Sequence, residues 1–155
     1  MSEVFHIVLY QPEIPPNTGN VGRLCVGVGA SLHLVPPLGF STDEKAVRRA
    51  GLDYWRHVAL TEHASTAAFW DWAYGRRVHL FSAKATASVY DGRFEAGDVF
   101  VFGCETKGLP ADVLSRGEAY RLPMKPGPIR SLNLGNAVSI VTYEALRQIG
   151  PAWFA

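Results

Sequence analysis

The segment FGCETKGLP (residues 102–110) decides how this chain folds, because it joins a buried strand to a glycine-rich polar loop. The apolar run at residues 98–103 predicts a strand that is covered on both faces. Two further segments follow or abut apolar runs and mix glycines with polar side chains: NTGNVGR (residues 17–23) and SLNLGNA (residues 131–137). Glycines let a backbone turn sharply or approach a ligand, and polar groups at strand ends of an α/β sheet bind ligands. The three segments together indicate an enzyme.

Strands and helices are expected to alternate around these segments. Strands are predicted at residues 4–10, 31–35, 57–60, 78–82, 98–103 and 120–122. Residues 11–16 contain three prolines and predict an extended loop, followed by a helix over 18–29 with Asn17 as its N-cap. Further helices are predicted at 45–50, 65–74, 110–114 and from 134 to 149. The pattern predicts an α/β fold in one domain (1–155), with a mainly parallel six-stranded sheet and helices on both faces.

Composition narrows the class of protein. The net charge of +1 argues neither for nor against a nucleic-acid partner. No apolar run approaches the roughly 18 residues of a membrane span, and no export signal is evident at the N-terminus. The two cysteines, Cys25 and Cys104, are too few for a disulfide framework or a four-thiolate zinc site. A reduced, cytoplasmic protein without membrane or metal is therefore expected.

Several familiar signatures are missing. Residues 27–29 (GVG) close a predicted helix, and Leu32 stands where a dinucleotide fingerprint has its third glycine. Residues 109–110 (LP) replace the Lys-Ser/Thr of a phosphate loop, and no Gly-x-Ser-x-Gly elbow is present. The five histidines lack metal-ligand spacing, and three of them are expected as core or sheet residues of strands: His6, His33 and His79.

With those signatures excluded, the three segments match one family in order and spacing. The chain resembles the SPOUT (SpoU-TrmD) RNA methyltransferases, which have Asn-x-Gly-Asn-x-x-Arg, Phe-Gly-x-Glu-x-x-Gly-Leu and Ser-Leu-Asn-Leu-x-Asn-Ala as motifs. The segments at residues 10–20, 48–54 and 143–148 are similar to the corresponding segments of the TrmL-like branch of this family. That branch methylates the 2′-hydroxyl of the wobble cytidine or uridine (position 34) of tRNA, with leucine isoacceptors expected. The resemblance implies a C-terminal trefoil knot, S-adenosyl-L-methionine as cofactor and a homodimer.

The resemblance also implies roles for individual residues. The cofactor is expected between the loops after the last three strands, held by Phe81, Gly103, Leu122, Met124 and Ser131. The expected catalytic residues are Arg23, Asn20, Glu105, Ser131 and Asn133. RNA phosphates are expected to meet Arg48, Arg49, Lys125 and Arg130, with a splayed base stacked on Tyr54 or Trp55.

The chemistry of these side chains limits what they can do. A guanidinium is a poor base, so Arg23 is expected to orient the acceptor and stabilise the developing oxyanion. Glu105 is expected to order the knot, although acceptance from Arg23 or Asn20 and a role as base stay open. Capping of a helix is an equal alternative for Asn20 and Asn133.

This chain departs from the branch pattern at three positions, and rival functions stay open. Gly135 stands where Ser is usual, Gly22 replaces a larger apolar residue, and Cys104 places a thiol near the expected cofactor. The partner is expected to be the tRNA anticodon stem-loop, bound by a homodimer that pairs its first and last helices. The alternatives are a 2′-hydroxyl elsewhere in tRNA or in rRNA, a non-catalytic RNA-binding module and, less favoured, an enzyme acting on a small nucleotide. The lack of a separate RNA-binding extension speaks against the first alternative, another 2′-hydroxyl in tRNA or rRNA.

Overall fold

The computed structural model describes residues 3–43, 45–46 and 52–155. Within these residues, seven strands form one sheet in the order β3-β2-β1-β6-β4-β7-β5, and every neighbouring pair is parallel. The strands are β1 (His6–Tyr10), β2 (Ser31–Val35), β3 (Ala59–Glu62), β4 (Val78–Phe81), β5 (Ala87–Ser88), β6 (Val99–Phe102) and β7 (Glu118–Arg121). The predicted parallel α/β sheet is confirmed, but the count of six strands is wrong. Strand β5 has only two residues, too few to leave a pattern in the sequence.

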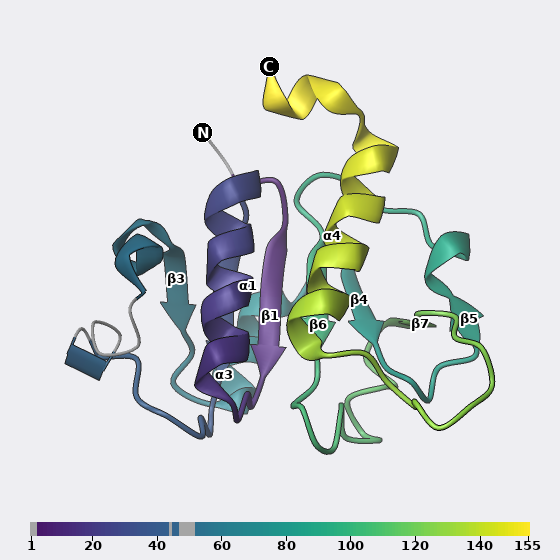
Figure 1. Ribbon diagram of the computed structural model, residues 1–155, viewed down its shortest axis with the longest axis horizontal. Coiled ribbons are helices and arrows are strands. Elements are labelled where there is room, and N and C mark those ends of the chain that lie inside the picture. The colour runs from purple at the N-terminus through teal and green to yellow at the C-terminus, as the bar shows by residue number, and fades with distance from the viewer. Residues whose placement is uncertain (1–2, 44, 47–51) are drawn as a thin grey trace.

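Helices cover both faces of the sheet (Figure 1). Helices α1 (Pro15–Val28) and α4 (Leu134–Ile149) lie side by side on one face, and α3 (Thr66–Ala73) lies on the other. Side chains of β1 alternate between the two layers: Ile7 and Leu9 pack in the core with α1 and α4, whereas Val8 and Tyr10 pack in the core with α3. Burial on both faces explains why β1 is a nearly continuous apolar run.

Helix α1 begins earlier than the sequence predicted. Pro15 and Pro16 occupy its first two positions, where the missing N–H groups would have no helical partner. The prediction of an extended loop through residue 16 with Asn17 as N-cap is therefore wrong. Asn17 lies in the first turn, and the N-cap is Ile14, which gives no side-chain cap.

Other boundaries shift by smaller amounts. The third strand, predicted at 57–60, is found at residues 59–62 as β3, because residue 57 ends the 3-10 helix η1 (Asp53–His57). Residues 111–115 form turns rather than the predicted helix. Most of the helix predicted at 45–50 lies outside the described residues. The prediction of α4 is confirmed, with Asn133 as its N-cap.

A polar cluster lies between the sheet and α3. His6 Nδ1 lies 2.7 Å from Ser31 Oγ and 3.2 Å from His33 Nε2, while His33 Nδ1 lies 2.9 Å from His63 Nε2. Burial is the main reason that the pKa of His33 falls to about 3. Because His33 faces its partners with opposite ring nitrogens, one ion could not bind all three rings. Nowhere in the described residues do three His, Cys, Asp or Glu side chains form a metal-binding group.

A second buried histidine lies nearer the other edge of the sheet. His79 Nε2 lies 2.8 Å from Asp98 Oδ2, and Arg77 Nε donates to Asp98 Oδ1 at 2.9 Å. His33 and His79 are buried and His6 is half-buried, and all three lie in strands, which confirms their prediction as core or sheet residues. Among the helices of the described residues, none is both long and apolar enough to cross a membrane.

Candidate active site

A pocket of about 810 Å³ opens at the carboxyl ends of β4, β6 and β7. It is lined by residues 81–84 after β4, residues 102–108 after β6 and residues from 120 to 137 around the start of α4. Asn17 of α1 completes the wall, so all three sequence motifs contribute to one cavity. The loops that form it lie at the lower end of the sheet in Figure 1, opposite both chain termini. This is the sheet edge at which parallel α/β folds bind ligands.

Glu105 connects the second motif to the first. Its carboxylate accepts hydrogen bonds from the backbone N–H groups of Glu13 and Ile14, each at 2.9 Å, and from Asn17 Nδ2 at 3.1 Å. A carboxylate is favoured here because the N-terminal end of α1 carries partial positive charge, and the N–H groups of Glu13 and of the N-cap Ile14 lie just before the helix, where they have no helical partner. Three donors already occupy the two oxygens. This geometry favours the ordering role of Glu105 over a role as base.

Glu13 returns the contact. Its Oε1 accepts from Thr106 Oγ1 at 2.7 Å and from the Thr106 backbone N–H at 3.2 Å. These hydrogen bonds, the side-chain one first, lower the pKa of Glu13, so it stays ionised at neutral pH. Each of the two loops, the one before α1 and the one after β6, therefore has a carboxylate that accepts hydrogen bonds from the other loop. Sequence reasoning missed Glu13, because a Glu between prolines carries no signal of its own.

Asn17 links the first motif to the third. Its Oδ1 accepts from Asn133 Nδ2 at 3.0 Å, while its Nδ2 donates to Glu105. Asn133 Oδ1 in turn accepts the backbone N–H of Asn136 at 3.3 Å, which caps α4. Asn133 is thus both a helix cap and a link between motifs. The sequence assigned Asn17 only a capping role; its place beside the polar second and third motifs could have been inferred from the shared sheet edge.

The apolar wall of the pocket holds the residues expected to bind the cofactor. Phe81 stacks on Phe102, with ring centroids 4.9 Å apart and planes 14° apart. A Cβ on Gly103 would lie 2.2 Å from the carbonyl carbon of Gly108, so the loop itself requires glycine there. The expected cofactor residues Phe81, Gly103, Leu122, Met124 and Ser131 all line the pocket. Cys104 lines it too, with Sγ 3.9 Å from the Gly108 carbonyl oxygen.

Two of the expected catalytic residues lie outside this pocket. Arg23 and Asn20 are exposed on α1 and do not line it, whereas Glu105, Ser131 and Asn133 do. Asn20 lies near the start of α4, its Cβ 3.5 Å from the point where a Cβ of Gly135 would be. The structure therefore separates Arg23 from the expected cofactor residues within one chain.

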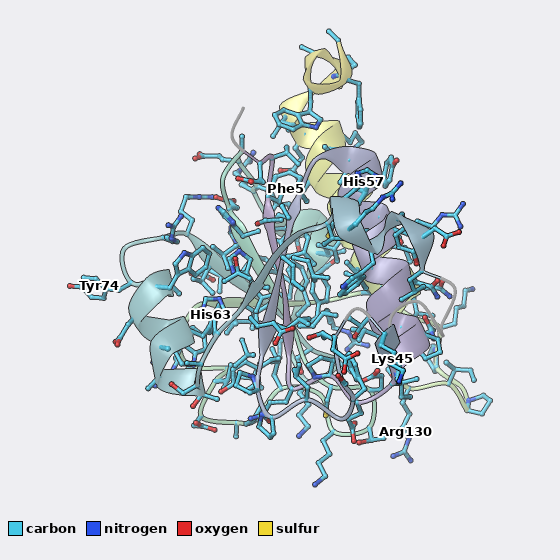
Figure 2. The ribbon with its side chains drawn as sticks, turned by 90° about the vertical axis from the view of Figure 1, so that its left-hand side faces the viewer. Phe5, Lys45, His57, His63, Tyr74 and Arg130 are labelled. Atoms are coloured by element: carbon cyan, nitrogen blue, oxygen red, sulfur yellow. The ribbon has the colours of Figure 1, made fainter. Side chains whose placement is uncertain are left out.

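Basic side chains gather around the same pocket. Arg130 lines it, Lys125 is exposed beside it, and Arg48 and Arg49 lie outside the described residues. The pocket is also lined by three cations that sequence reasoning missed: Lys84, Lys107 and Arg121. Within the described part of the chain, none of the four lining cations forms an ion pair. Figure 2 shows Arg130 projecting from the lower end of the molecule, where the pocket opens.

Known proteins share this arrangement over nearly the whole chain. A tRNA (cytidine(34)-2′-O)-methyltransferase of Burkholderia ambifaria is 49% identical over 152 residues, which cover 95% of this chain and 97% of that protein. The protein of the same name from Escherichia coli (strain K12) is 47% identical over 150 residues, 95% of each chain. A solved structure reported as "Structural insights into the 2-OH methylation of C/U34 on tRNA" has a TM-score of 0.87 and 52% identity, covering 94% of this chain and 95% of that one.

The family comparison covers the pocket as well. The family model described as the SpoU rRNA Methylase family matches residues 4–143, a range that contains all three motifs and every residue lining the cavity. On this match and on relatives of nearly 50% identity, the chain belongs to the SpoU methylase family.

Proposed function

We propose that this protein transfers a methyl group from S-adenosyl-L-methionine to the 2′-hydroxyl of the wobble nucleotide, C34 or U34, of tRNA. The observation that carries the proposal is the meeting of all three motifs at one pocket. The substrate is taken from relatives at 47–52% identity, whose names or reports specify position 34 of tRNA. The chain acts as one domain, 1–155, in the cytoplasm, with leucine isoacceptors as the expected tRNAs.

The pocket fits the cofactor in size and in chemistry. Its volume of about 810 Å³ lies within the roughly 300–1,000 Å³ of small-molecule sites. Phe81, Leu122 and Met124 offer an apolar wall for a flat adenine ring, and the loop at 103–108 offers backbone hydrogen-bonding groups. The bound cofactor supplies a methyl group that its sulfonium already activates. A knot is supported by the path of the chain, which leaves β7 near the sheet edge and returns to α4 beside α1.

The protein's own contribution to the reaction is positioning and charge stabilisation. Ser131 and Asn133 lie at the pocket wall, where they can bind the acceptor ribose. Arg23 would stabilise the negative charge that the 2′-oxygen gains as its proton passes to solvent water. That oxygen would take the methyl group as the sulfur–methyl bond of the cofactor breaks, and the neutral thioether would be the leaving group. Holding the oxygen in line with the methyl group accounts for several kcal/mol of the acceleration in well-oriented systems. The three hydrogen bonds that Glu105 accepts support a role in positioning the loops rather than in proton transfer.

The position of Arg23 outside its own pocket favours a site completed by a second copy of the chain. We therefore include a homodimer in the proposal. Apolar side chains that remain exposed on or near α1 and α4 support it: Val26, Ile140, Tyr143 and Phe154. Because a two-fold axis uses the same surface twice, pairing of this surface would bring Arg23 of one protomer toward the pocket of its partner. Light scattering at micromolar concentration tests the mass.

The cations around the pocket, which form no ion pair with the residues that the structure describes, fit an RNA partner. Lys84, Lys107, Arg121 and Arg130 are free to neutralise phosphates of the anticodon stem-loop, and Lys125, Arg48 and Arg49 extend the set. Each phosphate contact releases counterions, so tRNA affinity should fall steeply with salt. Because Lys125 lies beside the pocket rather than in its lining, mutation of Lys125 separates RNA binding from cofactor binding.

The direct test is transfer of labelled methyl groups into total tRNA, followed by mapping of the labelled nucleotide. Wild type should label the 2′-oxygen at position 34, and Arg23→Ala should lose this activity while it keeps its affinity for the cofactor. Arg76→Ala, on the α3 side of the molecule, is the matched control and should retain activity.

The other outcomes separate the alternatives. Because the family description names rRNA, ribosomal RNA is assayed beside tRNA. Label elsewhere in tRNA or in rRNA would reject the wobble assignment and keep the enzyme. Methylation of free nucleosides would favour a small-molecule enzyme. Binding of RNA without cofactor binding or methyl transfer would favour a non-catalytic module.

A further inference from the structure

Two glycines of α1 face η1 and let it approach closely. A Cβ on Gly22 would lie 2.8 Å from the Trp55 ring, and a Cβ on Gly19 would lie 3.0 Å from a methyl group of Leu52. Any larger side chain at Gly22 would displace Trp55. The departure from the family pattern at position 22 is therefore matched in this chain by a large ring that fills the space.

This close approach fixes the position of Tyr54, which lies between Leu52 and Trp55 in the chain. Tyr54 is half-buried, and its hydroxyl donates to the backbone carbonyl of Gly19 at 2.8 Å. In an α-helix that carbonyl is one turn before Arg23 and accepts the Arg23 backbone N–H. The Tyr54 ring is thus held at a defined position relative to the backbone of Arg23.

Arg23 has Tyr54 as its side-chain neighbour. The guanidinium carbon lies 5.9 Å from the centroid of the Tyr54 ring, within the reach of a cation–π contact. Arg23 forms no ion pair with any residue that the structure describes. A ring face attracts the cation without using its N–H donors, so these stay available for an incoming oxygen.

We propose that Tyr54 is a positioning residue that holds the Arg23 guanidinium ready for the acceptor ribose. The proposal rests on the proposed function for the reaction itself, but the contact between the two side chains does not depend on it. An exposed arginine has many rotamers, and a fixed neighbouring ring reduces them before the substrate binds. This role replaces the expectation that Tyr54 or Trp55 stacks on an RNA base, since both rings already pack against α1.

The kinetic test compares Tyr54→Leu with Tyr54→Phe in single-turnover methyl transfer at saturating cofactor and tRNA. Tyr54→Leu should lower the rate by about threefold to fivefold, the size of an exposed cation–π contact, while cofactor affinity measured by calorimetry stays the same. Tyr54→Phe keeps the ring and should stay within about twofold of wild type. Tyr74→Leu is the matched control, because Tyr74 is 91% exposed and projects away from the molecule (Figure 2).

A second measurement follows the motion of the Arg23 side chain and does not depend on methyl transfer. Nitrogen-15 relaxation of the Arg23 Nε–H group, assigned by its loss in Arg23→Lys, should show restricted motion in wild type and Tyr54→Phe and greater motion in Tyr54→Leu. Gly22→Ala should also increase this motion by pushing Trp55 away, and it serves if Tyr54→Leu does not fold. Unchanged relaxation in both variants would overturn the proposal, as would an equal loss of rate in Tyr54→Phe and Tyr54→Leu. Absence of methyl transfer by wild type would instead reject the proposed function.

Discussion

The pocket end of the sheet and the layer beneath α3 both hold hydrogen-bonded polar side chains, yet their surroundings differ. At the pocket, Glu105 and Asn17 border an open cavity and bind donors that belong to loops and helix ends. Beneath α3, the centroid of the His33 ring lies 4.4 Å from that of Trp72 and 5.1 Å from that of His63. Only 3% of His33 is exposed.

Hydrogen-bonded polar side chains therefore have different roles in the two regions. In the pocket region the carboxylates of Glu105 and Glu13 join the loop after β6 to the start of α1, while the cavity walls remain open to a ligand. Beneath α3, burial disfavours the charged form, and the pKa of His33 falls to about 3. A polar cluster beside a cavity at the strand ends can serve recognition, whereas a cluster sealed by a helix and a Trp ring serves stability.

Gly103→Ala should break the pocket side of this comparison most severely. Because the added Cβ would lie 2.2 Å from the Gly108 carbonyl carbon, the loop at 103–108 must move. Methyl transfer should fall by about a hundredfold, the cost of misplacing reacting groups by about 1 Å. Calorimetry should show weakened cofactor binding. Gly127→Ala is the control, since no atom lies within 4 Å of its Cβ position, and equal behaviour of the two variants would contradict the assignment.

Glu105→Gln tests whether the charge of the carboxylate matters. The amide would turn one acceptor into a donor that faces the N–H groups of Glu13 and Ile14. The free energy of unfolding should fall by about 2 kcal/mol, the value of a hydrogen bond to a charged group, and cofactor affinity should fall about tenfold. Urea denaturation and calorimetry measure the two effects. Glu95→Gln, at an exposed ion pair of 3.7 Å, should change neither quantity. If Glu105→Gln also left stability and cofactor affinity unchanged, the hydrogen bonds of Glu105 to the start of α1 would be dispensable.

Acid should break the histidine side of the comparison first. Burial lowers the pKa of His33 from 6.5 to about 3, with smaller contributions from the charges of His6, His63 and Arg76. Burial also lowers the pKa values of His6 and His63, although Glu3 acts in the opposite direction on His6. The unfolded chain binds a proton near pH 6.5 and the folded His33 does not, so stability is complete above pH 6.5 and is lost as pH falls toward 3. His33 alone should remove about 2 kcal/mol at pH 5.

Urea unfolding at pH 7.5 and pH 5 measures this loss. His33→Gln should be less stable at pH 7.5 but should lose less stability on acidification, since it cannot bind the proton. An identical pH dependence in wild type and His33→Gln would contradict the buried, neutral His33.

Gly135→Ser should have the smallest effect on methyl transfer, and it tests whether the space at this position belongs to the site. A Cβ at this position would lie 3.3 Å from Asn133 Oδ1 and 3.5 Å from Asn20 Cβ, which needs only a small adjustment. Serine is accepted in the first turn of a helix, so methyl transfer should stay within about twofold of wild type. A fall of about tenfold or more in single-turnover rate would show that the space at Gly135 is itself part of the site.

Local patterns predicted the elements that depend on neighbouring residues. The apolar runs located most of the strands, and the helical spacing of α4 located it within a residue, because burial of one face leaves a period in the sequence. The start of α1 differs from the prediction because proline usually breaks a helix, whereas Pro15 and Pro16 both fit the first helical turn. The short β5 was missed because pairing with β7 alone defines it.

The sequence by itself determined the parallel α/β class, the three polar segments and, through their resemblance, the family and most residues that line the pocket. These depend on local turn chemistry and on the period of apolar residues. Only the tertiary structure decided that Glu105 meets the backbone of Glu13, 92 positions earlier, that Asn133 meets Asn17 across 116 positions, and that Arg23 lies beside Tyr54 outside the pocket. The physical reason is that strand order and helix packing set contacts between distant residues, and neither leaves a pattern that a short segment can show.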